Sequence, residues 1–215
     1  IMPSLVGSEM CIRDSCKIVA SNSLDEYLIR DLMMQEAKID TFGVGERLIT
    51  AKSAPVFGGV YKLAAVEDEQ GNIIPKIKIS ENTTKITNPH YKKLYRFYDN
   101  ESGKALADEL CVYDETIDGT KPHTIFDPDA IWKTKTLTDY SVKELHVTVF
   151  KNGELVYKQP SLFEIKRYCA EQTETLWDEV KRFENPHTYY VDLSKKLWDI
   201  KNELLEKSKD GKGLK

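Results

Sequence analysis

The segment from Phe42 to Leu63 constrains the fold of this chain more than any other stretch. Apolar residues predict a strand here, and Gly43 and Gly45 follow directly before a run that is compatible with a helix. Such a glycine turn presents free backbone N–H groups at the positive end of a helix dipole, an arrangement that favours bound phosphate. The Gly-x-Gly also suits an ordinary tight turn. It lacks the third glycine of a dinucleotide fingerprint, because Leu48 stands there, and it lacks the Gly-Lys-Ser/Thr of a P-loop.

A second turn of the same kind lies upstream. Residues 17–21 form an apolar run that suits a buried parallel strand, and Ser23 to Glu26 has the form of a capping box. The box predicts a helix over 24–36 with Ser23 as its N-cap, and a strand is expected over 39–44. Residues 17–50 therefore indicate a β-α-β-α unit, which places both turns at the carboxyl ends of neighbouring parallel strands. Many α/β barrels bind phosphate at that position.

The residues of the two turns are the predicted phosphate-binding site. The alternative for the first turn is plain helix capping, which needs no ligand. The predicted contacts are Asn22, Ser23, Gly43, Val44, Gly45 and Glu46.

The chain is expected to combine the last βα units of an incomplete α/β barrel with a β-rich layer and C-terminal helices, an α/β protein that is α+β over these residues. Residues 1–15 are interpreted as a cloning artefact, because a sequencing-library adapter can encode residues 5–14. The predicted segments are then a barrel end at 16–63, a β-rich domain at 64–158, a helical segment at 159–207 and a flexible tail at 208–215.

Local signals beyond the first unit predict further elements. Strands are expected at 58–66, 76–79, 93–98, 143–150 and 154–158, the last two joined through a hairpin turn at Asn152-Gly153. A second capping box, Ser161 to Glu164, predicts a helix that ends near Phe183. Asp192 is predicted to cap the final helix.

Composition narrows the classes of function. The net charge of -4, with both signs interspersed, favours neither a nucleic-acid surface nor a membrane surface. No apolar run approaches the length of a membrane span, and the cysteines left after residue 15 are isolated, so a reduced cytoplasmic setting is expected. No metal site is predicted: Asp127 and Asp129, and the acidic residues at 114–118, are interpreted as solvated turns. The histidines are interpreted as structural or surface residues, because none is expected beside a convincing acid or nucleophile; they are His90, His123, His146 and His187.

Several stretches together resemble the C-terminal half of bacterial nicotinate phosphoribosyltransferase. The resemblance extends in order over residues 16–215, and the stretches that carry it are 20–26, 42–45, 55–63, 76–82 and 177–186. It implies a type II phosphoribosyltransferase that joins nicotinate to phosphoribosyl pyrophosphate with coupled ATP hydrolysis in NAD salvage. It also implies Mg²⁺ and ATP as cofactors and a homodimer.

By this resemblance the predicted contacts would border the ribose 5-phosphate. Many relatives carry Asp where Ser23 stands and Thr where Glu46 stands, so backbone N–H contacts are expected there more than side-chain contacts. The family's active-site histidine and the residues that hold the nicotinate ring would lie upstream of Cys16. No catalytic residue is therefore assigned, and the chain alone is expected to be inactive and poorly soluble.

The sequence leaves three alternatives open. The chain could be a phosphate- or nucleotide-binding module without catalysis, a purely structural β-rich domain with two helices, or part of the related nicotinamide-using enzyme, since base selection is made outside these residues.

Overall fold

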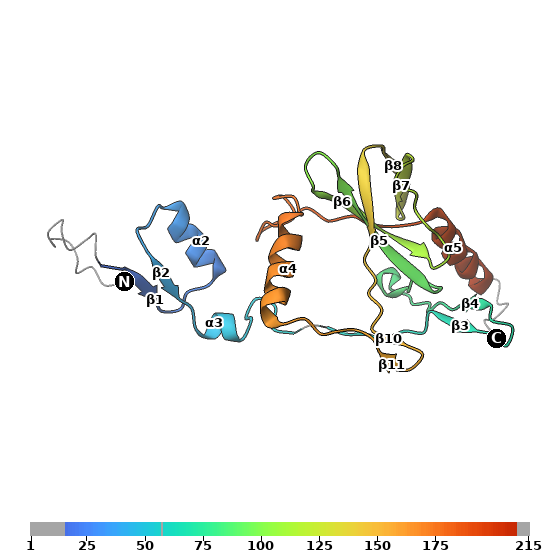
Figure 1. Cartoon of the computed structure of the whole chain (residues 1–215), viewed down its shortest axis with the longest axis horizontal. Helices are drawn as coiled ribbons and strands as arrows, with labels where there is room; N and C mark the ends of the chain where they lie inside the picture. Colours follow the sequence, from blue (N-terminus) through green and yellow to red (C-terminus); the bar gives the residue numbers. More distant parts are fainter. Residues whose placement is uncertain (1–15, 57, 210–215) are drawn as a thin grey trace. The chain divides into compact units, whose positions relative to one another are not determined.

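The structure is a computed structural model that describes residues 16–56 and 58–209. The chain divides after Val60 into two compact units (Figure 1). The predicted adapter peptide at 1–15 and the last residues of the predicted tail, 210–215, lie outside the described residues.

The first unit alternates strands and helices. β1 pairs with β2 in parallel, with Val19 opposite Thr41, which confirms the predicted β-α-β-α order. The described residues of this unit contribute two strands to a parallel sheet, so the barrel stays a prediction. The elements are β1 (Val19–Ser21), α2 (Glu26–Met34), β2 (Thr41–Gly43) and α3 (Glu46–Ile49).

The N-cap of α2 is Asp25, and the prediction of Ser23 is wrong. Asp25 has an extended backbone, φ -139° and ψ 177°, and its Oδ1 accepts a hydrogen bond from the Leu28 backbone N–H at 2.9 Å. Ser23 has a φ of 52°, whereas an N-cap residue normally lies in the β region. The helix is therefore shorter than the predicted 24–36, and the Ser23 hydroxyl donates instead to Asn22 Oδ1 at 3.4 Å.

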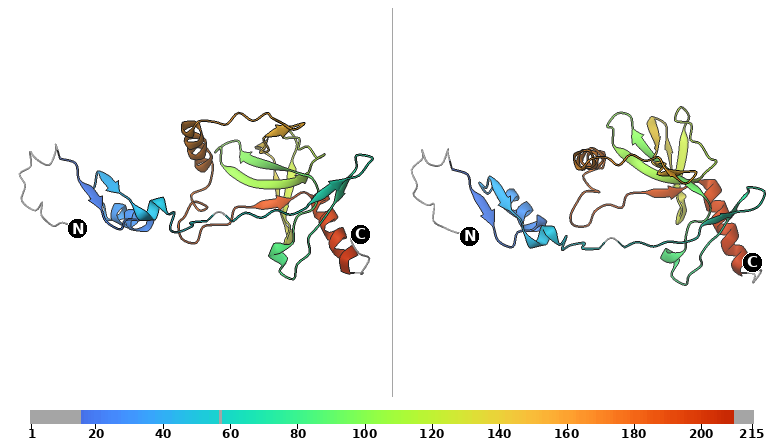
Figure 2. Two further views of the ribbon diagram at one scale, coloured as in Figure 1. Left: turned by 90° about the horizontal axis from the view of Figure 1, so that it is seen from below. Right: turned by 60° about the horizontal axis from the view of Figure 1, so that its bottom comes forward.

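The second unit is centred on a four-stranded mixed sheet in the order β12-β6-β5-β9, with the long β5–β6 pair clear in Figure 2. β5 runs antiparallel to β6 and to β9, and β12 joins β6 in parallel. Phe97 of β5 is fully buried against Ile125 and Leu137, which come from a separate hairpin of β7 and β8. The strands are β5 (Lys92–Asp99), β6 (Ala105–Val112), β7 (His123–Asp127), β8 (Ala130–Leu137), β9 (Tyr140–Glu144) and β12 (Val191–Leu193).

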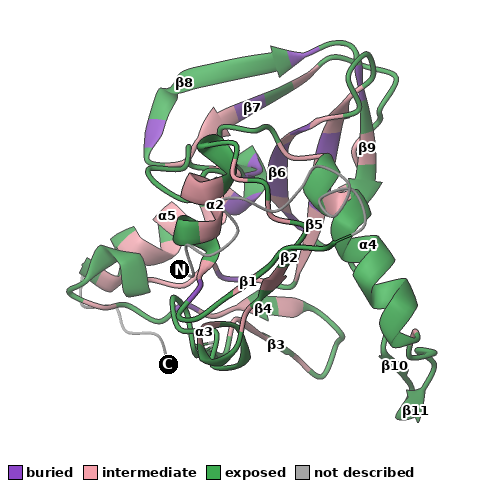
Figure 3. Ribbon diagram, turned by 90° about the vertical axis from the view of Figure 1, so that its left-hand side faces the viewer, coloured by how far each residue is buried: buried purple, intermediate pink, exposed green. Residues whose placement is uncertain are grey.

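The remaining elements of this unit lie outside that sheet and the β7–β8 hairpin. Leu197 of α5 packs with Val112 and Leu193 in a second buried cluster, whereas α4 contributes no buried residue (Figure 3). These elements are β3 (Ala65–Glu67), β4 (Ile73–Pro75), the 3₁₀ helix η1 (Thr83–Lys85), β10 (Phe150–Lys151), β11 (Glu154–Leu155), α4 (Leu162–Glu174) and α5 (Lys195–Lys209).

In this unit, the predictions that rest on a few neighbouring residues agree with the structure better than the predicted bounds of the longer strands and helices. The Asn152-Gly153 hairpin and the Ser161–Glu164 capping box are both present. The strand predicted at 76–79 is absent, those at 58–66, 143–150 and 154–158 shrink to short pieces, and α4 ends at Glu174, not near Phe183. Asp192 does not cap α5: it lies within β12, and the Ser194 hydroxyl accepts the hydrogen bond from the Leu197 backbone N–H at 3.2 Å.

Candidate functional site

The two predicted turns of the first unit line one shared cavity of about 340 Å³. Five of the six predicted residues line it, and Val44 does not. The structure therefore brings together two loops that lie about twenty residues apart in the sequence, because β1 and β2 are adjacent and parallel. The lining residues are Ser21, Asn22, Ser23, Leu24, Gly43, Gly45, Glu46, Arg47 and Lys52.

Backbone N–H groups of α3 are available at this cavity. The Leu48 and Ile49 backbone N–H groups donate to the Gly45 carbonyl oxygen at 3.0 and 3.1 Å, so the amides left for a ligand are those of Glu46 and Arg47, and Gly45, the N-cap of α3, has no side chain to satisfy them. On the opposite loop, Asn22 and Ser23 hold left-handed backbone angles, φ 94° and 52°. Non-glycine residues adopt this region rarely, and such strain is concentrated at functional sites.

Gly43 and Gly45 serve different purposes. A Cβ added at Gly43 would lie 3.1 Å from Ser21 Oγ and 3.3 Å from Ser21 Cβ, so the close approach of the two strands requires glycine. A Cβ added at Gly45 would meet no atom within 4 Å. Protein packing therefore does not explain Gly45, whereas the approach of a ligand to the backbone would.

An ion pair joins the two loops, which the sequence reasoning missed. Arg47 Nη1 donates to Asp25 Oδ2 at 2.6 Å, while the other oxygen of Asp25 caps α2. Asp25 thereby ties the start of α2 to α3 and holds the walls of the cavity together. The sequence around Gly45 and Arg47 does not indicate that Arg47 pairs with Asp25, because this ion pair depends on the register of β1 and β2.

The cavity carries one cation without an acidic partner in the part of the chain that the structure describes. Lys52 lines the cavity and forms no ion pair there, whereas Arg47 is engaged with Asp25. With the amides of Glu46 and Arg47, Lys52 gives the cavity donors that suit a small anion, while the Glu46 carboxylate in the same lining offsets its charge.

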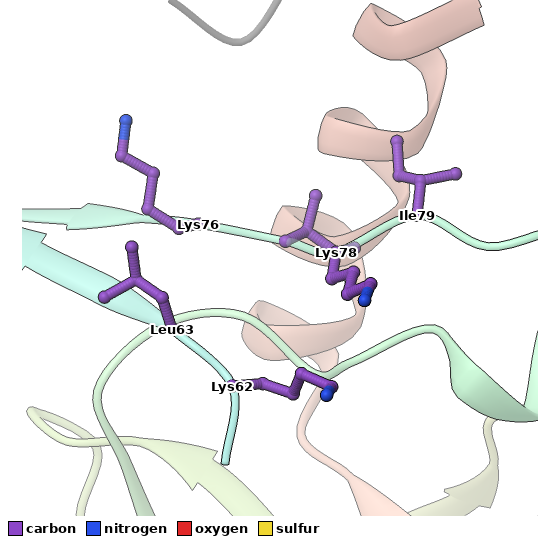
Figure 4. A pocket seen from close by; sticks show the side chains of 6 residues that line it. Lys62, Leu63, Lys76, Lys78 and Ile79 are labelled. Atoms are coloured by element: carbon purple, nitrogen blue, oxygen red, sulfur yellow. The ribbon is translucent and has the colours of Figure 1, made fainter. Parts of the chain in front are cut away.

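A second cavity, of about 450 Å³, lies within the second unit and is lined by three lysines (Figure 4). Lys62, Lys76 and Lys78 form no ion pair with the described residues, and Figure 4 shows Lys62 and Lys78 extending to the same side while Lys76 points away. Unpaired lysines in a cavity attract multiply charged anions. The alternation Lys76-Ile77-Lys78-Ile79 is the sequence pattern that could have indicated this group of lysines. It supported only a predicted strand, which the segment does not form.

One histidine of the described residues lies beside a carboxylate. His123 Nε2 lies 2.7 Å from Glu109 Oε2, so the prediction that no histidine has an acidic neighbour is wrong. Across residues 16–56 and 58–209, no three His, Cys, Asp or Glu side chains group closely enough to hold a metal ion. In the same residues, no helix has both the length and the apolar composition that a membrane crossing requires.

The described residues form an α+β protein in which residues at the ends of two parallel strands line the first cavity. A sequence profile described as the nicotinate phosphoribosyltransferase C-terminal domain matches residues 91–201. A nicotinate phosphoribosyltransferase of Bacillus subtilis is 38% identical over 193 residues, which are 90% of this chain and 39% of that protein. One from Dictyostelium discoideum is 35% identical, over 87% of this chain and 32% of its own length. The chain therefore belongs to the nicotinate phosphoribosyltransferase family, a family of enzymes.

The fold agrees with a solved structure. The crystal structure of human nicotinic acid phosphoribosyltransferase superposes with a TM-score of 0.65 over 92% of this chain, at 23% identity. The chain covers 34% of that structure and 39% of the Bacillus protein, so it spans well under half of these relatives. The matched profile begins at residue 91 and does not reach the cavity of the first unit.

Proposed function

We propose that this chain is the C-terminal part of a nicotinate phosphoribosyltransferase, which forms nicotinate mononucleotide and pyrophosphate from nicotinate and phosphoribosyl pyrophosphate in NAD salvage. The observation that carries the proposal for these residues is the shared cavity of the first unit. Two loops from neighbouring parallel strands line it, and its glycine Gly45 has no packing role.

In this proposal the cavity holds the ribose 5-phosphate. The uncapped amides of α3 and the Lys52 ammonium donate to the phosphate oxygens, and the Arg47–Asp25 pair fixes the spacing of the two loops. Anchoring this end of the substrate orients the ribose for reaction at its other end, because a positioned substrate loses less entropy in the transition state.

For Mg²⁺, which the family implies together with ATP, these two cavities offer at most one carboxylate ligand. Glu46 is the one carboxylate that lines the first cavity, and the lysine-lined cavity has none among its lining residues. A bound Mg²⁺ usually needs one or two carboxylates in addition to substrate phosphates. We therefore propose that other parts of the full-length protein hold Mg²⁺ and ATP and perform the coupled hydrolysis. A homodimer is proposed on the same family grounds, and a cytoplasmic location is proposed because the cysteines after residue 15 are isolated.

The decisive experiment assays the full-length protein that contains this chain. Product is measured with nicotinate or with nicotinamide as the base, each with and without ATP. Nicotinate mononucleotide formation that ATP accelerates is expected. Formation of nicotinamide mononucleotide instead would favour the related enzyme. Binding of ribose 5-phosphate without any product would favour a non-catalytic module.

Substitution of the two glycines separates ligand contact from packing. Gly45→Ala in the full-length protein should raise the KM for phosphoribosyl pyrophosphate about tenfold, because the added Cβ keeps the phosphate from the backbone and weakens about one charge-assisted hydrogen bond, with little change in Tm. Gly43→Ala should instead reduce the free energy of unfolding by about 1–3 kcal/mol, because the added methyl group crowds Ser21. Steady-state kinetics and thermal melts measure both effects. An unchanged KM in Gly45→Ala would contradict the proposal that this cavity holds the ribose 5-phosphate.

A further inference from the structure

A cavity of about 240 Å³ in the second unit lies between the hairpin of β7 and β8 and the strands β6 and β12. One part of its lining is apolar or aromatic, and another part is charged. Its carboxylates are Asp127 and Asp192, and its lysines, Lys133 and Lys135, both come from β8. The remaining lining residues are Leu106, Ile125, Phe126, Thr134 and Tyr190.

Asp192 is the unusual member of this lining. The residue is only 5% exposed, and its carboxylate receives no hydrogen bond and forms no ion pair within residues 16–56 and 58–209. A largely buried carboxylate without a partner is unfavourable, and because no fully buried side-chain oxygen of the described residues lacks a hydrogen bond, the Asp192 oxygens keep access to solvent in the cavity. Since Asp192 lines the cavity, the space in front of it is where a partner would lie.

The acidic neighbours of Asp192 are already satisfied. Asp127 accepts a hydrogen bond from the Asp129 backbone N–H at 2.9 Å and lies 3.6 Å from Lys133 Nζ. Glu109 lies opposite Asp192 in the β6–β12 register and contacts His123 at 2.7 Å. Lys133 is therefore engaged, and Lys135 is exposed to solvent, which screens its charge. Of these three carboxylates, Asp192 is the one without a cationic partner among the described residues.

From this arrangement we propose that the cavity binds a small organic cation, a protonated amine with an apolar body, whose ammonium group donates to the Asp192 carboxylate. The apolar body would pack on Phe126, Ile125 and Leu106. A metal ion is a poorer occupant, because the described residues offer no group of three metal-ligating side chains there. The site is independent of the phosphate cavity and of the proposed reaction.

The local electrostatics agree with this assignment. Burial, followed by the charges of Asp127 and Glu109, raises the pKa of Asp192 to about 6. A cation placed against the carboxylate would reverse that effect and favour its ionised form. Binding of the amine should therefore stabilise the ionised carboxylate of Asp192, whereas a neutral ligand of the same shape would not.

The test compares benzylamine with benzyl alcohol, which has nearly the same shape and no charge, on the full-length protein at neutral pH. Isothermal titration should detect binding of benzylamine and at least about tenfold weaker binding of benzyl alcohol, as expected for loss of a charged hydrogen bond. Asp192→Asn should weaken benzylamine by a similar factor. Asp129→Asn, which removes an exposed charge close to the cavity but outside its lining, should change it less than about twofold.

Three results would overturn the proposal. They are equal affinity of the two compounds, equal affinity of wild type and Asp192→Asn, and no binding of benzylamine to wild type. The last would indicate that another segment of the full-length protein fills the cavity. Thermal melts of both variants, run alongside, establish that each is folded, and Asp192→Asn keeps the size of the side chain it replaces.

Discussion

At the level of single residues, Asp192 links the stability of the second unit to pH. Its pKa is raised from 3.8 to about 6, first by burial and then by the charges of Asp127 and Glu109, whose own partners are Lys133 and His123. A carboxyl group with a raised pKa in the folded state favours folding while it is protonated. That contribution is present below pH 3.8 and is lost as the pH rises through about 6.

Asp192→Asn should therefore stabilise the full-length protein above pH 6 and have much less effect near pH 4. A shift of this size corresponds to at most about 3 kcal/mol at neutral pH. Denaturant unfolding at pH 4, 5, 6 and 7 measures it, with Asp129→Asn as the matched control because Asp129 is exposed. A variant whose stability follows the wild type at every pH would show that the Asp192 carboxylate is not a source of repulsion.

At the level of elements, local signals predicted helix starts only where backbone geometry agreed with them. Ser161 and Glu164 form the predicted reciprocal box, because Ser161 has an extended backbone. Ser23 and Glu26 have the same capping-box spacing in the sequence. The left-handed φ of Ser23 is incompatible with the N-cap position, and Asp25 is the N-cap instead. The sequence pattern contains the hydrogen-bonding groups and omits the backbone angle, so it cannot choose between two neighbouring cap residues.

Asp25 is predicted to stabilise α2 and the phosphate cavity through different oxygens. Asp25→Ala should reduce the free energy of unfolding of the full-length protein by about 1 kcal/mol through loss of the cap. Asp25→Asn should keep most of that stability, because asparagine caps equally well, and lose the ion pair with Arg47. Both variants should raise the KM for phosphoribosyl pyrophosphate, as should Arg47→Ala, which costs at most about 1 kcal/mol of stability.

Thermal melts and steady-state kinetics on these three variants provide the measurement. If Asp25→Ala and Asp25→Asn lose the same stability, the cap contributes nothing. A normal KM in Arg47→Ala would mean that the loops keep their spacing without the ion pair.

At the level of the whole molecule, sequence patterns predicted contacts between near neighbours and missed distant ones. The Asn152-Gly153 hairpin and the β1–β2 pair were predictable, because few residues separate their strands. The pairing of β12 with β6 joins residues about eighty positions apart and converts the expected cap at Asp192 into a strand. Likewise, Trp177 donates to the Ala105 carbonyl at 3.0 Å, a contact beyond the end of α4 that helical periodicity does not contain. The first cavity was predictable in its backbone turns, while Arg47 and Lys52 were found only in the structure.

The exposed apolar side chains of both units predict the behaviour of the isolated 215-residue chain. Large apolar residues that are at least 65% exposed include Met34, Leu48, Ile49, Val56, Trp132, Phe150, Leu155, Leu162 and Phe163. Exposure of this kind marks surfaces that are normally covered and promotes aggregation when they are not. We therefore expect the chain alone to be poorly soluble and inactive, and the full-length protein to be soluble.

The measurement is the soluble fraction and the elution volume of both proteins, expressed in parallel and passed through a size-exclusion column. Replacing Leu162 and Phe163 by Ser on the exposed α4 should increase the soluble fraction of the isolated chain, because neither side chain contributes to the core. In the full-length protein the same change should reduce solubility or stability if another segment covers α4. A monomeric isolated chain with a cooperative melt would contradict the expectation, and nicotinate mononucleotide formation by that chain would place the catalytic residues within it.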